Sequence, residues 1–247
     1  MPTVRDLVYL NRDFRKACQT AIASHQGPFN AALWPILFLT VKIMRHNEAL
    51  ELLASRECGS EAGIVLRAMF EAVVNLLWIS KDPEIRLKRY TAYQLFDSQK
   101  YRDMTAKRKT TSNFTDTEIE QIETDFKRLY QDAQKIGQEF GFKKGKHWSG
   151  KGLKEMAKEI GWSERYDYLY KIYSDITHSN ILSLRDYVTV DSSGSMRVNI
   201  QPQIEHCKAC LSEAYVYLVT AFGFLDVFLD LNMEAVVDKA FLRIPKG

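Results

Sequence analysis

Residues 64–79 read Ile-Val-Leu-Arg-Ala-Met-Phe-Glu-Ala-Val-Val-Asn-Leu-Leu-Trp-Ile, and this stretch decides the fold class. Its only polar residues are Arg67, Glu71 and Asn75. An α-helix turns about 100° per residue, so three residues spaced by four form one narrow stripe along it. A helix that is apolar on nearly every other side packs inside a protein. We therefore predict a core helix in which Arg67 and Glu71 are buried and paired, because buried ions are costly without partners.

Further along the chain, Tyr170, Ser174 and His178 form a second polar row with the same spacing. Two helices that each carry one row of polar side chains are natural partners, because buried polar groups need hydrogen bonds. We expect Arg67 and Glu71 to contact this second row. If the pair is buried, replacing Glu71 by alanine should cost about 3–5 kcal/mol, because it strands the guanidinium.

Most of the remaining chain also predicts helices, separated by Gly, Pro and polar turns. Residues 187–200 instead contain two β-rich runs around a glycine-containing turn, which is typical of a hairpin. The fold class we expect is mainly α: a single-domain helical bundle over residues 1–247 with a small β-hairpin. Its predicted parts are N-terminal helices in 1–56 with a kink at Pro35, core helices in 60–184, the hairpin at 187–200, and a C-terminal helix over 202–232. Within the core, the polar row belongs to a helix predicted over 163–184.

Composition restricts the class of protein more than its function. The chain has 247 residues, 46% hydrophobic and 26% charged, which excludes a largely disordered protein. The net charge of +3 is too small to require a nucleic-acid partner. We see no signal peptide, and the apolar segment at 214–231 is interrupted by Asp226 and Asp230, which favours a packed helix over a membrane span. We therefore expect a soluble cytoplasmic protein without membrane association.

The sequence offers no convincing metal site, and we expect no metal and no other cofactor. His206, Cys207 and Cys210 lie close together, but structural zinc needs four ligands and usually two such pairs. Cys18 and Cys58 are isolated in the sequence. The four cysteines are expected to be reduced thiols, as is usual in the cytoplasm.

A basic loop follows near residues 142–152, with the sequence Phe-Lys-Lys-Gly-Lys-His-Trp-Ser-Gly-Lys-Gly. Lysines beside an aromatic ring suit a phosphate backbone and a stacked base, and glycines let backbone N–H groups approach an anion. The candidate anion- or RNA-binding residues are Lys143, Lys144, Lys146, His147, Trp148 and Lys151. The alternative is a solvated loop anchored by Trp148.

These motifs together resemble an uncharacterised bacterial helical family classed as a domain of unknown function. The resemblance covers about residues 61–200 and rests on Arg67-x3-Glu71, His147-Trp148-Ser149-Gly150-Lys151, Gly161 and Tyr170-x3-Ser174-x3-His178-Ser179-Asn180. The same set is similar, more distantly, to HEPN-type helical proteins. Many of those are metal-independent ribonucleases of toxin and phage-defence systems, with an Arg and a His four to six residues apart on one helix and a site often assembled across a dimer.

The HEPN resemblance implies a catalytic site with the following roles. His178 would transfer protons at a 2′-hydroxyl or leaving oxygen, and Arg67 would stabilise the charge on phosphorus. Glu71 would orient Arg67, while Tyr170 and Ser174 would hold the histidine or the phosphate. Ser174 stands four residues before His178, where that pattern would place an arginine, so only Arg67 is left to supply the guanidinium. RNA is the expected partner, and the chain is expected to form a homodimer or to bind a partner protein.

A second hypothesis needs no chemistry. The two polar rows can be a structural network that fixes which helices pair, in a non-catalytic helical module that binds a partner or a small anion. Exposure of His178 and Arg67 to a solvent-open cleft favours the ribonuclease, whereas sealed burial favours the module.

Overall fold

The computed structural model describes residues 2–25, 33–93, 116–143, 147–178, 187–198 and 203–244, together with Ile181 and Leu184. These residues form a mainly α fold with a small antiparallel hairpin, as the sequence predicted. They fall into two compact units, residues 1–78 with 156–247, and residues 79–155. We describe each unit by itself, and the single domain expected from the sequence stays a prediction.

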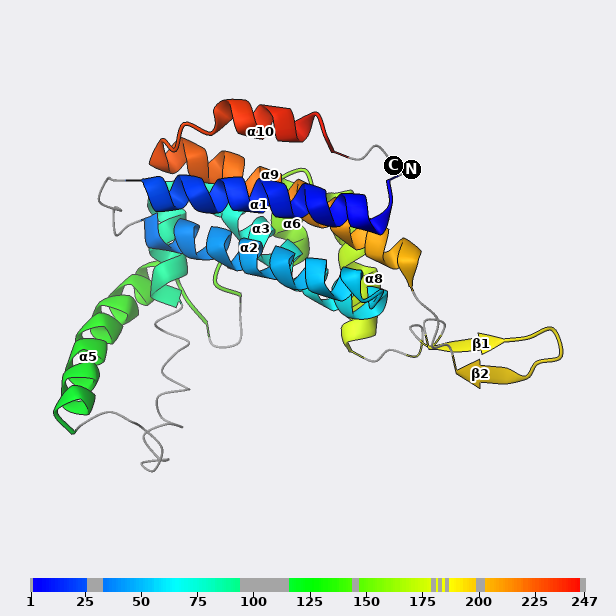
Figure 1. Ribbon diagram of the computed structural model, residues 1–247. Coiled ribbons are helices and arrows are strands. Elements are labelled where there is room, and N and C mark those ends of the chain that lie inside the picture. The colour runs from blue at the N-terminus through cyan, green and yellow to red at the C-terminus, as the bar shows by residue number, and fades with distance from the viewer. Residues whose placement is uncertain are drawn as a thin grey trace. The chain divides into compact units, whose positions relative to one another are not determined.

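The first unit is built on three long helices that lie side by side (Figure 1). They are α1 (Val4–Ser24), α2 (Trp34–Ser55) and α9 (Ile204–Leu229), and the short helix α10 (Glu234–Phe241) packs on α9. Thr3 starts α1 with a capping box: its hydroxyl accepts the N–H of Asp6, and the Asp6 carboxylate accepts the N–H of Thr3. Pro35 does not kink α2, as the sequence suggested, but lies in its first turn, where a missing N–H costs no hydrogen bond.

The same unit contains most of the core helix α3 (Gly59–Ser80) and of α6 (Leu153–Glu159). The bounds of α3 are close to those predicted. α3 ends, and α6 begins, in the second unit. The predicted helix over 163–184 differs. It consists of α7 (Ser163–Arg165), the π-helix η2 (Tyr166–Tyr170) and α8 (Lys171–Thr177). A π-turn holds one extra residue, so side chains after it are offset from a regular spacing of four. As a result Tyr173 is buried, whereas Ser174 is half-buried.

The C-terminal helix predicted over 202–232 is α9, which runs from Ile204 to Leu229, and the short helix α10 follows it beyond the predicted range. Asp230 ends α9 in a left-handed conformation (φ 51°), which aspartate tolerates better than most residues. The Asp226 carboxylate then accepts the N–H of Met233, 3.1 Å away, just before α10 begins. The two aspartates that interrupt the apolar pattern therefore mark a helix end and the start of the next helix.

The hairpin is formed by β1 (Val188–Val190) and β2 (Met196–Val198), with Val188 opposite Val198. In its turn the Asp191 carboxylate accepts the N–H groups of Ser193 and Ser195. The ribbon projects from the helices of its unit (Figure 1).

The second unit contains a helix over residues 83–93 and α5 (Asp116–Glu139). Asp82 precedes this helix and Pro83 is its first residue, as the sequence predicts for a cap and a first-turn proline. The sequence also predicts that this helix continues to about residue 107 and that Thr115, with Glu118 three residues on, forms a capping box, but residues 94–115 lie outside the described part of the chain.

Within the described part of the chain, two helices, α3 and α9, are long and apolar enough to cross a membrane by length and composition. About 67% of the apolar window in α3 and 50% of that in α9 is buried within the structure. Core helices of soluble proteins pass the same test, so membrane association stays untested.

A buried ion pair joins α1 to α2 in the first unit. Glu51 is only 2% exposed, and its two carboxylate oxygens accept hydrogen bonds from buried Arg15 at 3.1 and 3.2 Å. Arg12 adds a contact of 3.2 Å to the same carboxylate. Sequence analysis missed this pair, because charges on an amphipathic helix usually face solvent. The bidentate geometry satisfies the arginine fork, which makes such burial tolerable.

We expect Glu51→Ala to lower the free energy of unfolding by about 3–5 kcal/mol, because it leaves the buried Arg15 guanidinium without its main partner. Urea unfolding followed by circular dichroism measures this cost. Glu48→Ala is the matched control, since Glu48 is exposed and meets Arg15 only at 3.5 Å; its expected cost is below about 1 kcal/mol. Equal costs for the two variants would contradict the assignment.

Candidate functional site

Arg67, Glu71 and Tyr170 contact one another between α3 and η2, and we call this group the polar cluster. The Arg67 Nη2 atom donates to Tyr170 Oη at 3.0 Å, and Tyr170 Oη donates to Glu71 Oε1 at 3.1 Å. Arg67 Nη2 also lies 3.1 Å from Glu71 Oε1. The contact predicted between the two polar rows is therefore confirmed, and it is made by Tyr170.

Aromatic rings fix the position of Tyr170. Its ring stacks on Tyr166 with centroids 4.9 Å apart and lies 5.6 Å from the Phe70 ring. The Arg67 guanidinium lies 4.9 Å from the centre of the Tyr170 ring, within the range of a cation–π contact. Burial, followed by the nearby Glu71 carboxylate, raises the pKa of the Tyr170 hydroxyl, so it stays protonated and able to donate at neutral pH.

The polar cluster is more open than the sequence predicted. The side chain of Arg67 is 19% exposed and that of Glu71 is 40% exposed. The expectation that both are buried is therefore wrong for Glu71 and only partly right for Arg67. The apolar pattern of α3 could not show this, because a polar stripe looks the same whether it faces the interior or a partly open helix boundary. An ion pair this exposed is screened by water, so a loss of 3–5 kcal/mol on Glu71→Ala is no longer expected.

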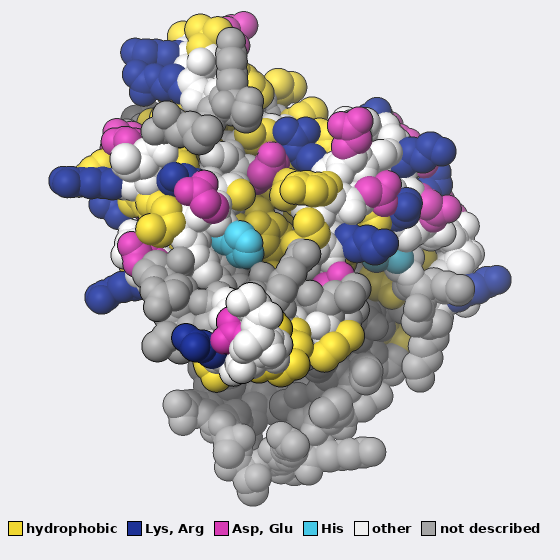
Figure 2. All heavy atoms as spheres, turned by 90° about the vertical axis from the view of Figure 1, so that its right-hand side faces the viewer, with side chains coloured by type: hydrophobic (Ala, Val, Ile, Leu, Met, Phe, Trp, Pro, Cys, Tyr) yellow, Lys and Arg dark blue, Asp and Glu magenta, His cyan; other side chains and the backbone are white. Residues whose placement is uncertain are grey.

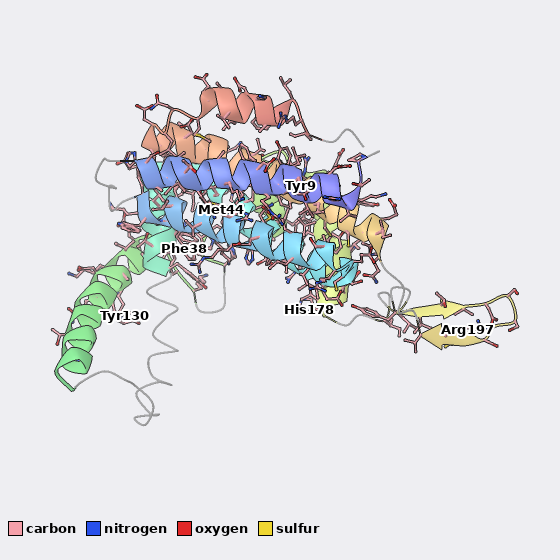
Figure 3. The ribbon with its side chains drawn as sticks, in the orientation of Figure 1. Tyr9, Phe38, Met44, Tyr130, His178 and Arg197 are labelled. Atoms are coloured by element: carbon pink, nitrogen blue, oxygen red, sulfur yellow. The ribbon has the colours of Figure 1, made fainter. Side chains whose placement is uncertain are left out.

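Ser174 and His178 do not join the contacts that hold the polar cluster. Ser174 is half-buried one turn beyond Tyr170, and His178 is exposed at the end of α8 (Figure 3). Eight residues of helix at about 1.5 Å each separate Tyr170 from His178 by about 12 Å along the axis. Of the predicted row, only Tyr170 therefore joins the polar cluster. The catalytic roles of these residues stay predictions.

Sequence analysis missed Tyr173, whose ring packs directly on the backbone of α3. Its ring lies against Gly63, where any side chain would overlap it. Its hydroxyl accepts a hydrogen bond from Cys210 Sγ of α9 at 3.3 Å. The signal was a glycine inside the core helix, since a helical glycine often marks a close approach of another element.

The basic loop of the second unit is organised around its tryptophan. Trp148 is buried and packs edge-to-face on Tyr90, with ring centroids 4.9 Å apart. Arg89 donates to the Trp148 carbonyl oxygen at 2.6 Å. The Trp148 ring is therefore not available to stack on a base, which corrects that part of the RNA-binding prediction and agrees with the alternative of a loop anchored by Trp148.

The polar residues of this loop also hold the loop itself. Ser149 is buried, and its hydroxyl lies 2.8 Å from His147 Nδ1 and 2.8 Å from the Lys151 carbonyl oxygen. Lys143 and Lys151 are exposed, whereas Lys144 and Lys146 lie outside the described residues. In the sequence the loop shortly precedes the row from Tyr170 to His178, which predicts that the two lie close together; they belong to different units, so this stays a prediction.

The charges on one face of the molecule are mixed. Figure 2 shows Lys and Arg side chains interspersed with Asp and Glu side chains among the residues described on that face. A nucleic-acid interface usually gathers its cations into a patch or stripe. Within the described part of the chain, no three His, Cys, Asp or Glu side chains come together as a candidate metal site.

Residues 33–196 match the model of a protein family described as a family of unknown function (DUF5677), and the chain belongs to this family. This agrees with the resemblance to an uncharacterised helical family. No curated protein and no solved structure matches the chain. The more distant similarity to HEPN-type proteins stays a prediction.

We expect Tyr170→Phe to lower the free energy of unfolding by about 1 kcal/mol, because it keeps the ring packing and removes one hydroxyl that bridges two partly buried charges. Urea unfolding measures the change. Tyr168→Phe, two residues earlier in η2, removes a hydroxyl from a largely exposed side chain and should change stability by less than about 0.5 kcal/mol. A Tyr170 variant as stable as this control would show that the bridge contributes nothing.

Proposed function

We propose that this member of the DUF5677 family is a non-catalytic helical binding module, whose polar cluster sets the pairing of α3 with η2. This proposal rests on the contacts that the Arg67 guanidinium makes within the protein. It is held by the Glu71 carboxylate, the Tyr170 hydroxyl and the face of the Tyr170 ring. A phosphate that bound the Nη2 atom would have to displace the Tyr170 hydroxyl and the Glu71 carboxylate.

The spacing of the candidate residues supports the same proposal. A general acid or base must come within about 3 Å of the proton it moves, and the charge-stabilising cation must reach the same phosphate. With Arg67 bound at the level of Tyr170, His178 lies about 12 Å further along the helix axis. This axial separation of the two positions argues against both side chains binding one phosphate within one chain.

A metal-independent ribonuclease, of the kind found in bacterial toxin and defence systems, remains a second candidate because of one observation. His178 is exposed and the Glu71 side chain is 40% exposed, so groups suited to acid–base chemistry reach solvent. A site completed by a second copy of the chain would overcome the separation within one chain. This candidate keeps RNA as substrate and a homodimer as the active form.

We also infer that the protein is soluble and cytoplasmic. The burial of much of α3 and α9 supports this, because a membrane-spanning helix would expose its apolar sides to lipid.

Incubation with end-labelled single-stranded and structured RNA at low salt tests the proposed function. We expect no cleavage above the buffer rate, with or without EDTA, and the same result for His178→Ala. Cleavage that resists EDTA and is lost in His178→Ala, but is kept in the control His25→Ala at the end of α1, would overturn the proposal in favour of the ribonuclease.

A further inference from the structure

The first unit contains an open groove of about 910 Å³ outside the polar cluster. One wall is formed by residues 161–165, 168 and 169, in α7, η2 and the two residues before α7, and the other by the first turns of α9; Pro2 and Leu7 also line the groove. This volume lies within the range of small-molecule sites, which combine apolar walls with a few polar groups.

The wall from α7 and η2 presents a fixed aromatic surface. The Trp162 ring is stacked on the buried Tyr217 with centroids 5.5 Å apart, and it lies 6.1 Å from the Phe70 ring. Tyr168 and Leu169 continue this wall, and Tyr168 is 69% exposed although it is a large aromatic residue. The π-turn contributes here, because it places Tyr168 outward while Tyr166 and Tyr170 stack on each other.

The opposite wall carries a cation whose partner is easily exchanged. Lys208 Nζ lies 2.8 Å from Glu205 Oε1, three residues earlier on the same helix. The Lys208 side chain is 27% exposed, whereas that of Glu205 is 79% exposed. An exposed pair of this kind contributes little to stability, so another acid can replace Glu205 at small cost. Ser212, one turn after Lys208, also lines the groove and adds a hydroxyl donor.

The other charges of the groove are either neutralised or solvated. Arg165 donates to Glu213 at 3.1 Å and lies 5.1 Å from the Trp162 ring centre, so both members of this pair are engaged. Glu164 is exposed at the rim. Of the two cations among the described lining residues, Lys208 has the more exposed partner, 79% for Glu205 against 25% for Glu213, so its partner is the more easily exchanged.

We propose that this groove binds an organic anion with a flat apolar body, an aromatic carboxylate or sulfonate. The body lies against Trp162, Tyr168 and Leu169, and the acid group takes the place of the Glu205 carboxylate on Lys208. The inference concerns residues outside the polar cluster, so its outcome is independent of whether the protein cleaves RNA.

A fluorescence titration of the full chain tests this proposal with two probes that share one aromatic body. The first is 8-anilinonaphthalene-1-sulfonate, and the second is N-phenyl-1-naphthylamine, which lacks the sulfonate. We expect saturable binding of the sulfonate to the folded protein. Lys208→Gln should weaken the sulfonate about fivefold and change the uncharged probe by less than about twofold, because only the sulfonate contacts the ammonium.

Two further variants give changes in opposite directions. Glu205→Gln should strengthen sulfonate binding about twofold to threefold, because it removes the competing carboxylate. Tyr168→Ala should weaken both probes, because it removes part of the shared apolar wall. Lys239→Gln, on the exposed side of α10, is the control for charge and should change neither affinity.

The proposal is overturned if the sulfonate does not bind saturably, or if Lys208→Gln and Lys239→Gln have the same affinity for it. It is also overturned if Glu205→Gln fails to strengthen sulfonate binding, since that shows that Glu205 and the anion do not compete. Circular dichroism and the urea midpoint of each variant verify that it is folded.

Discussion

The hydroxyl of Tyr170, placed between Arg67 and Glu71, is the interaction on which the arrangement of the core depends. α3 is apolar on most of its surface, so Arg67 and Glu71, the charged side chains of its middle turns, need partners at one place only. Tyr170 supplies a donor, an acceptor and a ring face there, and each is used. This requirement sets the position of η2 along α3, while the Tyr173 ring against Gly63 sets how closely the two elements approach.

Much of this could be predicted from the sequence. The spacing of Arg67 and Glu71 gave a correct helix and a correct partner element, because both follow from a period of 3.6 residues and from the need of ions for partners. The π-turn could not be predicted, since it appears in no residue pattern, and for that reason Tyr173 was overlooked in favour of Ser174. The burial of Arg15 with Glu51 was missed because a charged face on a helix usually indicates solvent.

The contacts of the motif residues explain why their function could not be predicted from the sequence. Motif residues were assigned to chemistry by type and spacing, yet their contacts decide whether they are free to act. Trp148 is an aromatic residue in a basic loop, but its ring packs inside the second unit. The groove on α9 carried no sequence signal, because Lys208 lies far along the chain from Trp162 and Tyr168.

A double-mutant cycle on Arg67→Gln and Tyr170→Phe tests the central claim, that the polar cluster is structural. Residues in one hydrogen-bond network are coupled, whereas functional groups often reduce stability and can be replaced with a gain. The account predicts that urea unfolding gives a stabilising coupling energy of about 1–2 kcal/mol between the two residues. A coupling below about 0.3 kcal/mol, or single variants more stable than the wild type, would contradict it.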